Sequence, residues 1–263
     1  MRPLSELDAT AVDGLVGVFT DIDDTLTHGG RIVPEAFLAL QRLAEAGLAV
    51  VPVTGRPGGW VDHLARMWPV DGVVGENGGL WFYMEGGQLV RRFVQDEATR
   101  RANRERLDDV AQLILAKVPG AALASDQPYR DLDLAIDFCE DVPALTRQDV
   151  DRIVVLFRSA GATCKVSSIH VNGWYGTFDK LAGCRGFVRD RWGRALDAEK
   201  DRWIYVGDSP NDEPMFEHFP RSVGVANVAA FVDRMTHLPR WVTPSEGGHG
   251  FAELAERLLA LRG

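Results

Sequence analysis

Short runs of apolar residues alternate along the chain with stretches in which apolar residues recur every three or four positions. The first run is Leu15–Thr20, and the stretch at 34–47 carries Phe37, Leu40 and Leu43 on one stripe. That stretch opens with a proline and closes with a glycine, the residues favoured at the first turn and just past the end of a helix. The order predicts a strand followed by an amphipathic helix.

The same alternation continues to about residue 83 and returns after residue 175. Strands that alternate with helices are typical of a parallel sheet covered by helices. Pro52 argues against an interior strand at its position, because proline cannot donate a hydrogen bond to a neighbouring strand. Further strands are expected at 49–53, 73–74, 203–206 and 223–225, and further helices at 59–67, 212–216 and 251–261.

Between about residues 84 and 175 the pattern changes. Gly86 and Gly87 are typical of a hairpin turn, and a charged helix is expected at 97–117. Thr146 can cap a helix that runs to Ser159. A half-buried strand is expected at 132–138, and the segment 165–171 resembles another strand. The pattern therefore predicts an α/β core made of residues 1–83 and 176–263, interrupted by an α+β insert at 84–175.

The composition of the chain limits the classes of partner that the protein is expected to bind. The chain has 263 residues, 46% of them hydrophobic, which is enough to bury a core. Its 38 acidic and 29 basic residues give a net charge of -9, which argues against nucleic acid and membrane partners. The three cysteines lack CxxC spacing, and neither a signal peptide nor a membrane-spanning run is evident. We expect a cytoplasmic protein that acts on a small metabolite, and the oligomeric state stays open.

Carboxylates gather where two of the expected strands end. Asp21, Asp23 and Asp24 follow the first strand, and Asp208 and Asp212 follow a later one. In open α/β sheets the carboxyl ends of the strands form the edge that binds ligands. Oxygen ligands without His or Cys suit magnesium rather than zinc. The alternative for each cluster is a solvated turn, since Asp also favours turns.

Two further segments suit a phosphate ligand. Thr54, Gly55 and Arg56 follow another expected strand, where a hydroxyl and free backbone N–H groups can hold phosphate oxygens. Lys180 precedes an expected helix and can supply positive charge to a phosphoryl group. Each segment alone is weak evidence for a phosphate site. A single lysine, for example, is usually a solvated surface residue.

Taken in order, the motifs at 21–25 (DIDDT), Thr54, Lys180 and 207–212 (GDSPND) resemble the signature of the haloacid dehalogenase-like (HAD) superfamily. The match spans both core segments, about two thirds of the chain. The insert resembles a type IIB cap, as in the trehalose, sucrose and mannosyl-3-phosphoglycerate phosphatases, the Cof-like sugar phosphatases and phosphomannomutase. The resemblance implies a Rossmann-like core, with a mainly parallel sheet flanked by helices, and an α+β cap domain for substrate specificity.

The resemblance also implies an activity: a Mg²⁺-dependent phosphatase for a small phosphate monoester of the sugar phosphate kind. Asp21 would be the nucleophile that forms an aspartyl phosphate, and Asp23 the general acid and base. Thr54 and the Gly55 amide would hold phosphoryl oxygens, with Lys180 between phosphate and nucleophile. Magnesium would bind Asp21, Asp208 and the Asp23 carbonyl, supported by Asp212 and Asn211.

Further phosphate or substrate contacts are expected from both parts of the chain. In the insert they are candidates by position only, since each residue type is also common in structural roles, and a histidine in an apolar run is often a core residue. The candidates are Asp24, Arg56, Asn77 and Asn211 in the core segments, and Arg130, Lys165, His170, Asn172 and Trp174 in the insert.

The sequence departs from the family pattern at two positions. Asp24 and Leu181 stand where many members have Gly, and neither change removes a reacting group. Two other functions stay open. A phosphomutase would pass the same aspartyl phosphate to a second hydroxyl, and a catalytically silent protein would only bind a sugar phosphate.

Overall fold

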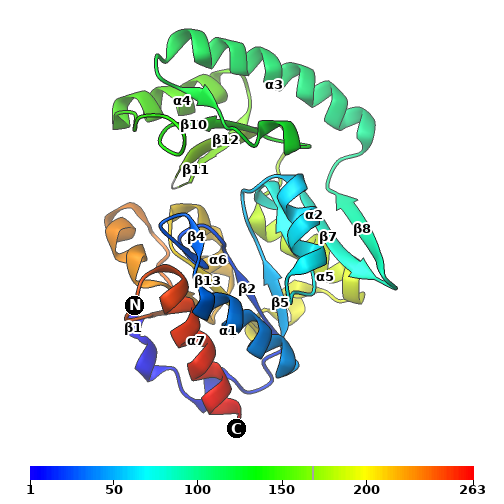
Figure 1. Cartoon of the computed structure of the whole chain (residues 1–263), viewed down its shortest axis with the longest axis vertical. Helices are drawn as coiled ribbons and strands as arrows, with labels where there is room; N and C mark the ends of the chain where they lie inside the picture. The colour runs from blue at the N-terminus through cyan, green and yellow to red at the C-terminus, as the bar shows by residue number, and fades with distance from the viewer. Residues whose placement is uncertain (168) are drawn as a thin grey trace.

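A parallel sheet forms the centre of the core. The computed structural model describes residues 1–167 and 169–263. Every neighbouring pair of strands in the sheet is parallel, and Figure 1 shows the sheet in the lower half of the molecule. The predicted α/β class is therefore confirmed. The six strands lie in the order β1 (Arg2–Pro3), β15 (Trp241–Val242), β14 (Ser222–Gly224), β13 (Trp203–Gly207), β2 (Gly17–Thr20) and β5 (Ala49–Pro52).

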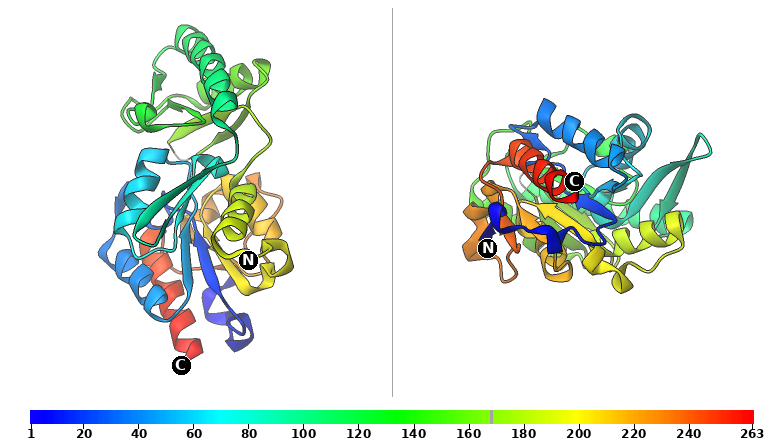
Figure 2. Two further views of the ribbon diagram at one scale, coloured as in Figure 1. Left: turned by 90° about the vertical axis from the view of Figure 1, so that its right-hand side faces the viewer. Right: turned by 90° about the horizontal axis from the view of Figure 1, so that it is seen from below.

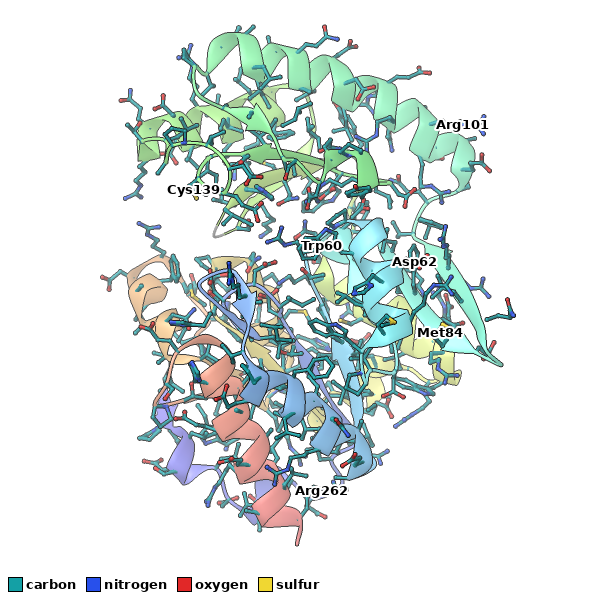
Figure 3. The ribbon with its side chains drawn as sticks, viewed as in Figure 1. Trp60, Asp62, Met84, Arg101, Cys139 and Arg262 are labelled. Atoms are coloured by element: carbon teal, nitrogen blue, oxygen red, sulfur yellow. The ribbon has the colours of Figure 1, made fainter. Side chains whose placement is uncertain are left out.

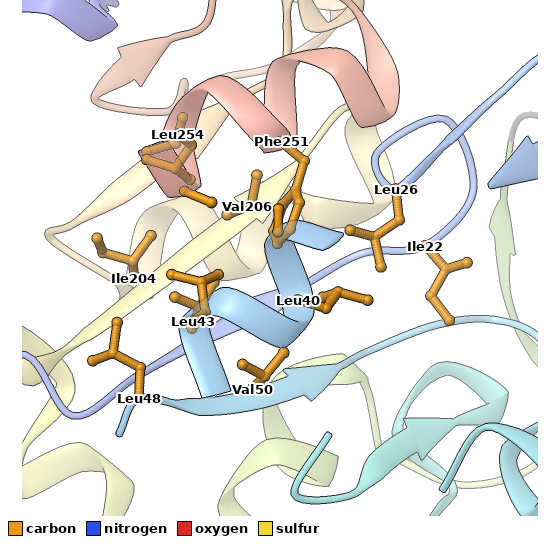
Figure 4. Packing of buried hydrophobic residues seen from close by; sticks show 14 of the residues in the cluster. Ile22, Leu26, Leu40, Leu43, Leu48, Val50, Ile204, Val206, Phe251 and Leu254 are labelled. Atoms are coloured by element: carbon orange, nitrogen blue, oxygen red, sulfur yellow. The ribbon is translucent and has the colours of Figure 1, made fainter. Parts of the chain in front are cut away.

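Helices cover both faces of this sheet (Figure 2). On one face α1 (Pro34–Glu45) packs against α7 (Gly247–Arg262). Figure 4 shows their leucine and phenylalanine side chains directed at Val50, Ile204 and Val206 of the sheet. The other face is covered by α5 (Lys180–Trp192) and α6 (Glu213–His218). Each fully buried side chain of this kind contributes about 1.5–3 kcal/mol to folding.

Pro52 fits its strand because β5 lies at the edge of the sheet. At an edge no further strand requires its missing N–H. After β5 the chain forms α2 (Gly58–Met67) and a small antiparallel sheet of β6 (Val73–Gly75), β7 (Leu80–Glu85) and β8 (Gln88–Phe93). Gly86 and Gly87 join β7 to β8 with φ of 55° and 78°, the left-handed conformations that a tight hairpin requires.

The insert forms a second body above the core (Figure 1). Its antiparallel sheet has the order β11 (Thr163–Val166), β12 (His170–Trp174), β10 (Leu134–Asp137) and β9 (Ala122–Leu123). The helices α3 (Glu97–Lys117) and α4 (Arg147–Ser159) cover the sheet on the side away from the core. Both helices lie where the sequence predicts them, and the Thr146 side chain caps α4.

One strand prediction in the insert is wrong. The segment 165–171 is not a single strand, because β11 and β12 pair antiparallel with Val166 opposite Val171. The chain therefore reverses between them. Alternating apolar residues continue on both sides of the turn, which hides the turn from a periodicity argument. Ser168 lies outside the described residues.

The border of the insert stays a prediction. β8 pairs along its length with β7, which packs on α2 and α5 of the core. We propose that the cap comprises residues 94–175, so that it starts after β8 rather than at residue 84. The remaining pieces are a small hairpin of β3 (Thr27–His28) and β4 (Arg31–Ile32) and short 3₁₀ turns at 4–6, 9–11, 76–78, 127–129, 196–198, 200–202, 210–212 and 226–234.

Among the described residues, none of the helices combines the length and the apolar surface required to cross a bilayer.

Candidate active site

Three buried carboxylates meet at one edge of the parallel sheet. One oxygen from each of Asp21, Asp208 and Asp212 lies within 4.8 Å of the others. β2 and β13 are adjacent parallel strands, so the residues that follow them emerge at the same edge. The two acidic clusters of the sequence therefore form one group.

Lys180 lies against two of these carboxylates. Its Nζ donates to Asp21 Oδ1 and to Asp212 Oδ1, each at 2.6 Å. Lys180 is the first residue of α5, and the Asp179 side chain caps this helix by accepting from the Ala182 amide at 2.8 Å. Burial alone would lower the pKa of Lys180, but Asp21 and Asp212 raise it above its ordinary value. The ammonium group therefore stays charged inside the site.

The carboxylates carry more negative charge than Lys180 can offset. Burial raises the pKa of Asp21 to about 8, and the charges of Asp212 and Asp23 add to this effect, whereas Lys180 lowers it. Burial and the neighbouring Asp21 likewise raise the pKa of Asp208 well above its ordinary value. A divalent cation among these oxygens would relieve their repulsion. Because all of these donors are carboxylates, the residues fit Mg²⁺.

Two residues that the sequence analysis missed orient the carboxylates. The Tyr205 hydroxyl donates to Asp212 Oδ1, and the Asp208 amide donates to Asp212 Oδ2 at 3.0 Å. Asn227 Nδ2 donates to Asp208 Oδ2 at 3.1 Å and to the carbonyl of Asp24 at 3.0 Å. Tyr205 lies within an apolar strand and gives no sequence signal. Asn227 follows the end of β14 at the ligand-binding edge, a position that could have marked it.

The loop after β5 lies beside this acidic group. Thr54 is fully buried, and its hydroxyl accepts from the Arg56 amide at 3.0 Å. The backbone N–H of Asn77 donates to the Thr54 carbonyl at 3.1 Å, which helps to hold the loop. Its side chain packs so closely on Gly55 that an added Cβ there would lie 3.3 Å from Asn77 Nδ2. Asn77 therefore shapes the loop rather than lining the cavity described next.

A cavity lies between core and cap, and Asp21 and Asp23 line it. The core contributes Asp21, Asp23 and the loop after β5, and the cap contributes residues of β12 and of the turn before it. Among the insert candidates, His170 and Asn172 reach this cavity. The described residues that line it are Asp21, Asp23, Gly55, Arg56, Ser167, Ile169, His170, Asn172, Ser209 and Asn211.

Comparison with known proteins agrees with this geometry. A family model of the haloacid dehalogenase-like hydrolases matches residues 18–109. A phosphoglycolate phosphatase of Methanoculleus marisnigri is 27% identical over 240 residues, which cover 90% of this chain and 94% of that protein. These two matches support the haloacid dehalogenase-like family for this chain. The family and the enzyme class expected from the sequence, a phosphatase, are thereby confirmed.

Solved structures show the same fold as this chain. A protein of Thermoplasma acidophilum superposes with a TM-score of 0.71 at 19% identity, over 93% of this chain and 99% of that one. A sugar phosphatase of HAD subclass IIB superposes with a TM-score of 0.64 at 16% identity, over 94% and 99%. The predicted core with a type IIB cap is therefore confirmed as the fold.

Two of the insert candidates do not line the cavity. Trp174 is buried, its Nε1 donates to the Phe178 carbonyl at 3.2 Å, and its ring stacks on Phe178 with 5.5 Å between centroids. It therefore belongs to the hydrophobic core and offers no face to a sugar. Lys165 is an exposed residue of β11, outside the described lining of the cavity.

Arg130 also has a structural place. Its Nη1 donates to the Gly55 carbonyl and to Asp133 Oδ1, both at 2.9 Å, and its other nitrogens bind Asp126. Arg130 thus links the cap to the loop after β5, and its positive charge is paired with two aspartates.

Asp24 does not reach the cavity lining either. Its φ is 58°, a left-handed conformation that explains why many family members have Gly at this position. Its amide donates to the Thr27 hydroxyl at 2.8 Å, so this N–H is not free for a phosphate oxygen.

Glu76 is the most heavily bonded acidic residue missed by the sequence analysis. Its fully buried carboxylate accepts from four backbone amides. Oε1 accepts from Gly58 at 2.9 Å and Asp131 at 2.8 Å, and Oε2 accepts from Leu132 at 2.6 Å and Asp133 at 3.1 Å. Glu76 thus joins the start of α2 in the core to residues 131–133 of the cap.

Proposed function

We propose that this HAD hydrolase is a magnesium-dependent phosphatase that transfers the phosphoryl group of a small phosphate monoester, of the sugar phosphate class, to Asp21 and then to water. The observation that carries the proposal is the convergence of Asp21, Asp208, Asp212 and Lys180 at one edge of the sheet. The names of the relatives support it, since one is a phosphoglycolate phosphatase and another a sugar phosphatase.

The first chemical step forms an aspartyl phosphate. A phosphate monoester dianion repels nucleophiles, so the site must first offset its charge. The ammonium of Lys180, 2.6 Å from Asp21 Oδ1, supplies part of this positive charge. Magnesium, when bound, supplies further charge to the transferring oxygens. An Asp21 oxygen then bonds to phosphorus as the ester bond to the leaving oxygen breaks, and the resulting acyl phosphate is more labile than the ester.

Asp23 handles the protons. It lies two residues after Asp21 and lines the same cavity. Arg56 fixes its orientation, with Nε 3.1 Å from each carboxylate oxygen and Nη2 2.8 Å from Oδ1. Asp23 gives a proton to the leaving alkoxide and then takes one from the water that attacks phosphorus. The second step releases phosphate and restores the Asp21 carboxylate.

Removal of magnesium should abolish most of the activity. We expect at least about a hundredfold less phosphate release after treatment with excess chelator, because the charge of the metal stabilises the transferring group by several kcal/mol. Added Mg²⁺ should restore the rate. It should also raise the melting temperature of the metal-free protein, because a ligand that binds only the folded state stabilises it.

Asp208→Asn provides the control for this metal effect. It removes one of the three clustered carboxylates while keeping the side-chain volume, so the melting shift on adding Mg²⁺ should largely disappear. Full activity after exhaustive chelation, or an unchanged melting shift in the variant, would contradict the proposed site.

Replacement of Asp23 should separate the two steps. With p-nitrophenyl phosphate, whose leaving group needs little help from an acid, Asp23→Asn should still form the aspartyl phosphate. Steady-state turnover should fall by about 10²–10⁴-fold because the base for the second step is lost. Rapid mixing should then show a burst of p-nitrophenol followed by slow release. Unimpaired turnover without a burst would remove Asp23 from this role.

The test of the function as a whole is a panel of sugar and polyol phosphates assayed with Mg²⁺. Release of inorganic phosphate supports the phosphatase. An isomerised sugar phosphate without net phosphate release would instead identify a mutase, and tight binding of one phosphate ester with no turnover of any would identify a silent binding protein.

A further inference from the structure

A row of charged side chains runs from the core into the cap beside the cavity. Arg56 Nη2 donates to Asp23 of the core at 2.8 Å and to Glu140 Oε1 of the cap at 3.0 Å. The second oxygen of Glu140 lies 2.8 Å from His170 Nε2. Figure 3 labels Cys139, the chain neighbour of Glu140, on the side of the cap that faces the core.

The backbone holds Glu140 in place. The buried carboxylate of Asp137 accepts from the amides of Cys139 at 2.9 Å, Glu140 at 2.8 Å and Asp141 at 2.8 Å. This turn directly follows β10, so Glu140 sits on a braced segment rather than on a loose surface loop. The buried imidazole of His170 packs beside it. Glu140 is therefore a fixed negative charge beside two residues that line the cavity, Arg56 and His170.

Glu140 forms an ion pair with Arg56. The neighbouring His170 and Arg56 lower the pKa of Glu140 to about 2, so it is ionised at neutral pH. Arg56 is thus shared between the carboxylates of Asp23 and Glu140, with Asp126 at 3.7 Å as a third neighbour. Its guanidinium also lies over the Trp60 ring, 4.5 Å from the centroid. The neighbouring carboxylates thus offset most of the positive charge of Arg56, and little of it remains to attract an anionic ligand.

The charges around the cavity favour one kind of leaving group. Among the described lining residues, Arg56 is the only Lys or Arg. A carboxylate on the leaving group would approach the ionised Glu140, while the one Lys or Arg of the described lining is already paired, which disfavours binding. Hydroxyl groups, in contrast, can hydrogen-bond to the side-chain oxygen of Asn172, whose Nδ2 donates to Asp133 Oδ2. Unfavourable charge placement of this kind is a common source of specificity.

We propose that Glu140 is a specificity-determining residue that makes this enzyme prefer uncharged, hydroxylated leaving groups over leaving groups that carry a carboxylate. The proposal rests on the phosphatase function proposed above. It also predicts a substrate preference different from that of the phosphoglycolate phosphatase that is 27% identical to this chain, because the name of that enzyme specifies a carboxylated substrate.

The test uses two pairs of esters that differ only in a hydroxymethyl or carboxylate group: 2-hydroxyethyl phosphate with 2-phosphoglycolate, and glycerol 3-phosphate with 3-phosphoglycerate. Phosphate release by the full-length enzyme with Mg²⁺ gives kcat/KM for each. We expect the uncharged ester of each pair to be favoured by at least about tenfold, the size of effect expected from one unfavourable charge contact.

Three variants assign the preference to Glu140. Glu140→Gln keeps the shape but removes the charge, and should reduce the ratio of the two kcat/KM values by about tenfold, mainly through a lower KM for the carboxylated ester. Glu140→Asp keeps the charge and should retain the preference. Glu105→Gln makes the same change of charge at an exposed position on α3 and should leave the ratio as in the wild type.

The outcomes separate the two proposals. A wild-type ratio near or below one, or a ratio that Glu140→Gln leaves unchanged, overturns the role of Glu140 while the phosphatase function stands. p-Nitrophenyl phosphate, which carries neither group, reports on the phosphatase itself. If neither it nor any of the four esters is hydrolysed, the phosphatase function is refuted and the specificity proposal falls with it.

Discussion

Asp21→Asn should reduce phosphatase turnover by about a thousandfold or more, which corresponds to about 4 kcal/mol of lost transition-state stabilisation. An amide oxygen is a poor nucleophile, and no other described carboxylate occupies its position between Lys180 and the cavity. The measurement is inorganic phosphate release with saturating Mg²⁺. Labelled substrate should leave no covalent phosphate on the variant, whereas acid quenching should trap it on the wild type.

The variant should remain folded, which distinguishes lost chemistry from lost structure. Burial raises the pKa of Asp21 to about 8, and Asp212 and Asp23 repel it, so neutralising the side chain removes an unfavourable charge. We expect a melting temperature at or above that of the wild type in the absence of metal. Asp109→Asn, at an exposed position on α3, is the control for the change of residue type and should be fully active. Normal turnover by Asp21→Asn would refute the aspartyl phosphate mechanism.

The core of the fold is predictable because its local signals agree with one another. Pro34 opens α1 at the expected place, and Gly47 follows the helix with a φ of 75°. The charged helix expected at 97–117 and the helix capped by Thr146 both form where the sequence predicts them. The turn between β11 and β12 escaped prediction because its location depends on which residues pair across the two strands.

The acidic group of the active site is also predictable, since the topology of a parallel sheet decides it. Asp21 and Asp208 are distant in sequence but follow neighbouring strands, and this brings them to one edge. No comparable rule of topology predicts which side chains of the cap reach the active site. Trp174, proposed from its position and its aromatic ring, is buried against Phe178, and only the packing of the cap on the core reveals this.

Glu140 and Glu76 show what a sequence alone cannot supply. A glutamate is usually a solvated surface residue, and nothing in the neighbouring residues indicates a partner distant in sequence. Glu140 meets Arg56, 84 positions away, and Glu76 meets the amides at 131–133, at least 55 positions away. Both contacts join core to cap, so they exist only once the insert has docked.

Glu76→Gln should destabilise the protein by about 3 kcal/mol or more. Each oxygen of Glu76 accepts two backbone amides, so the NH₂ group of glutamine would face two N–H donors wherever it pointed. Buried N–H groups left without an acceptor cost about 1–3 kcal/mol each. For a chain of this size the melting temperature should fall by about 6–12 °C, measured by thermal unfolding.

The loss should be accompanied by lower activity, since the amides bound by Glu76 belong to the start of α2, beside the loop after β5, and to the segment that enters β10 of the cap. Glu105→Gln, exposed on α3, makes the same substitution without a buried partner and should melt within about 1 °C of the wild type, as surface changes usually do. If Glu76→Gln melts as the wild type does, the four amides do not depend on the carboxylate, and the cap is positioned by other contacts such as the bond from Arg130 to the Gly55 carbonyl.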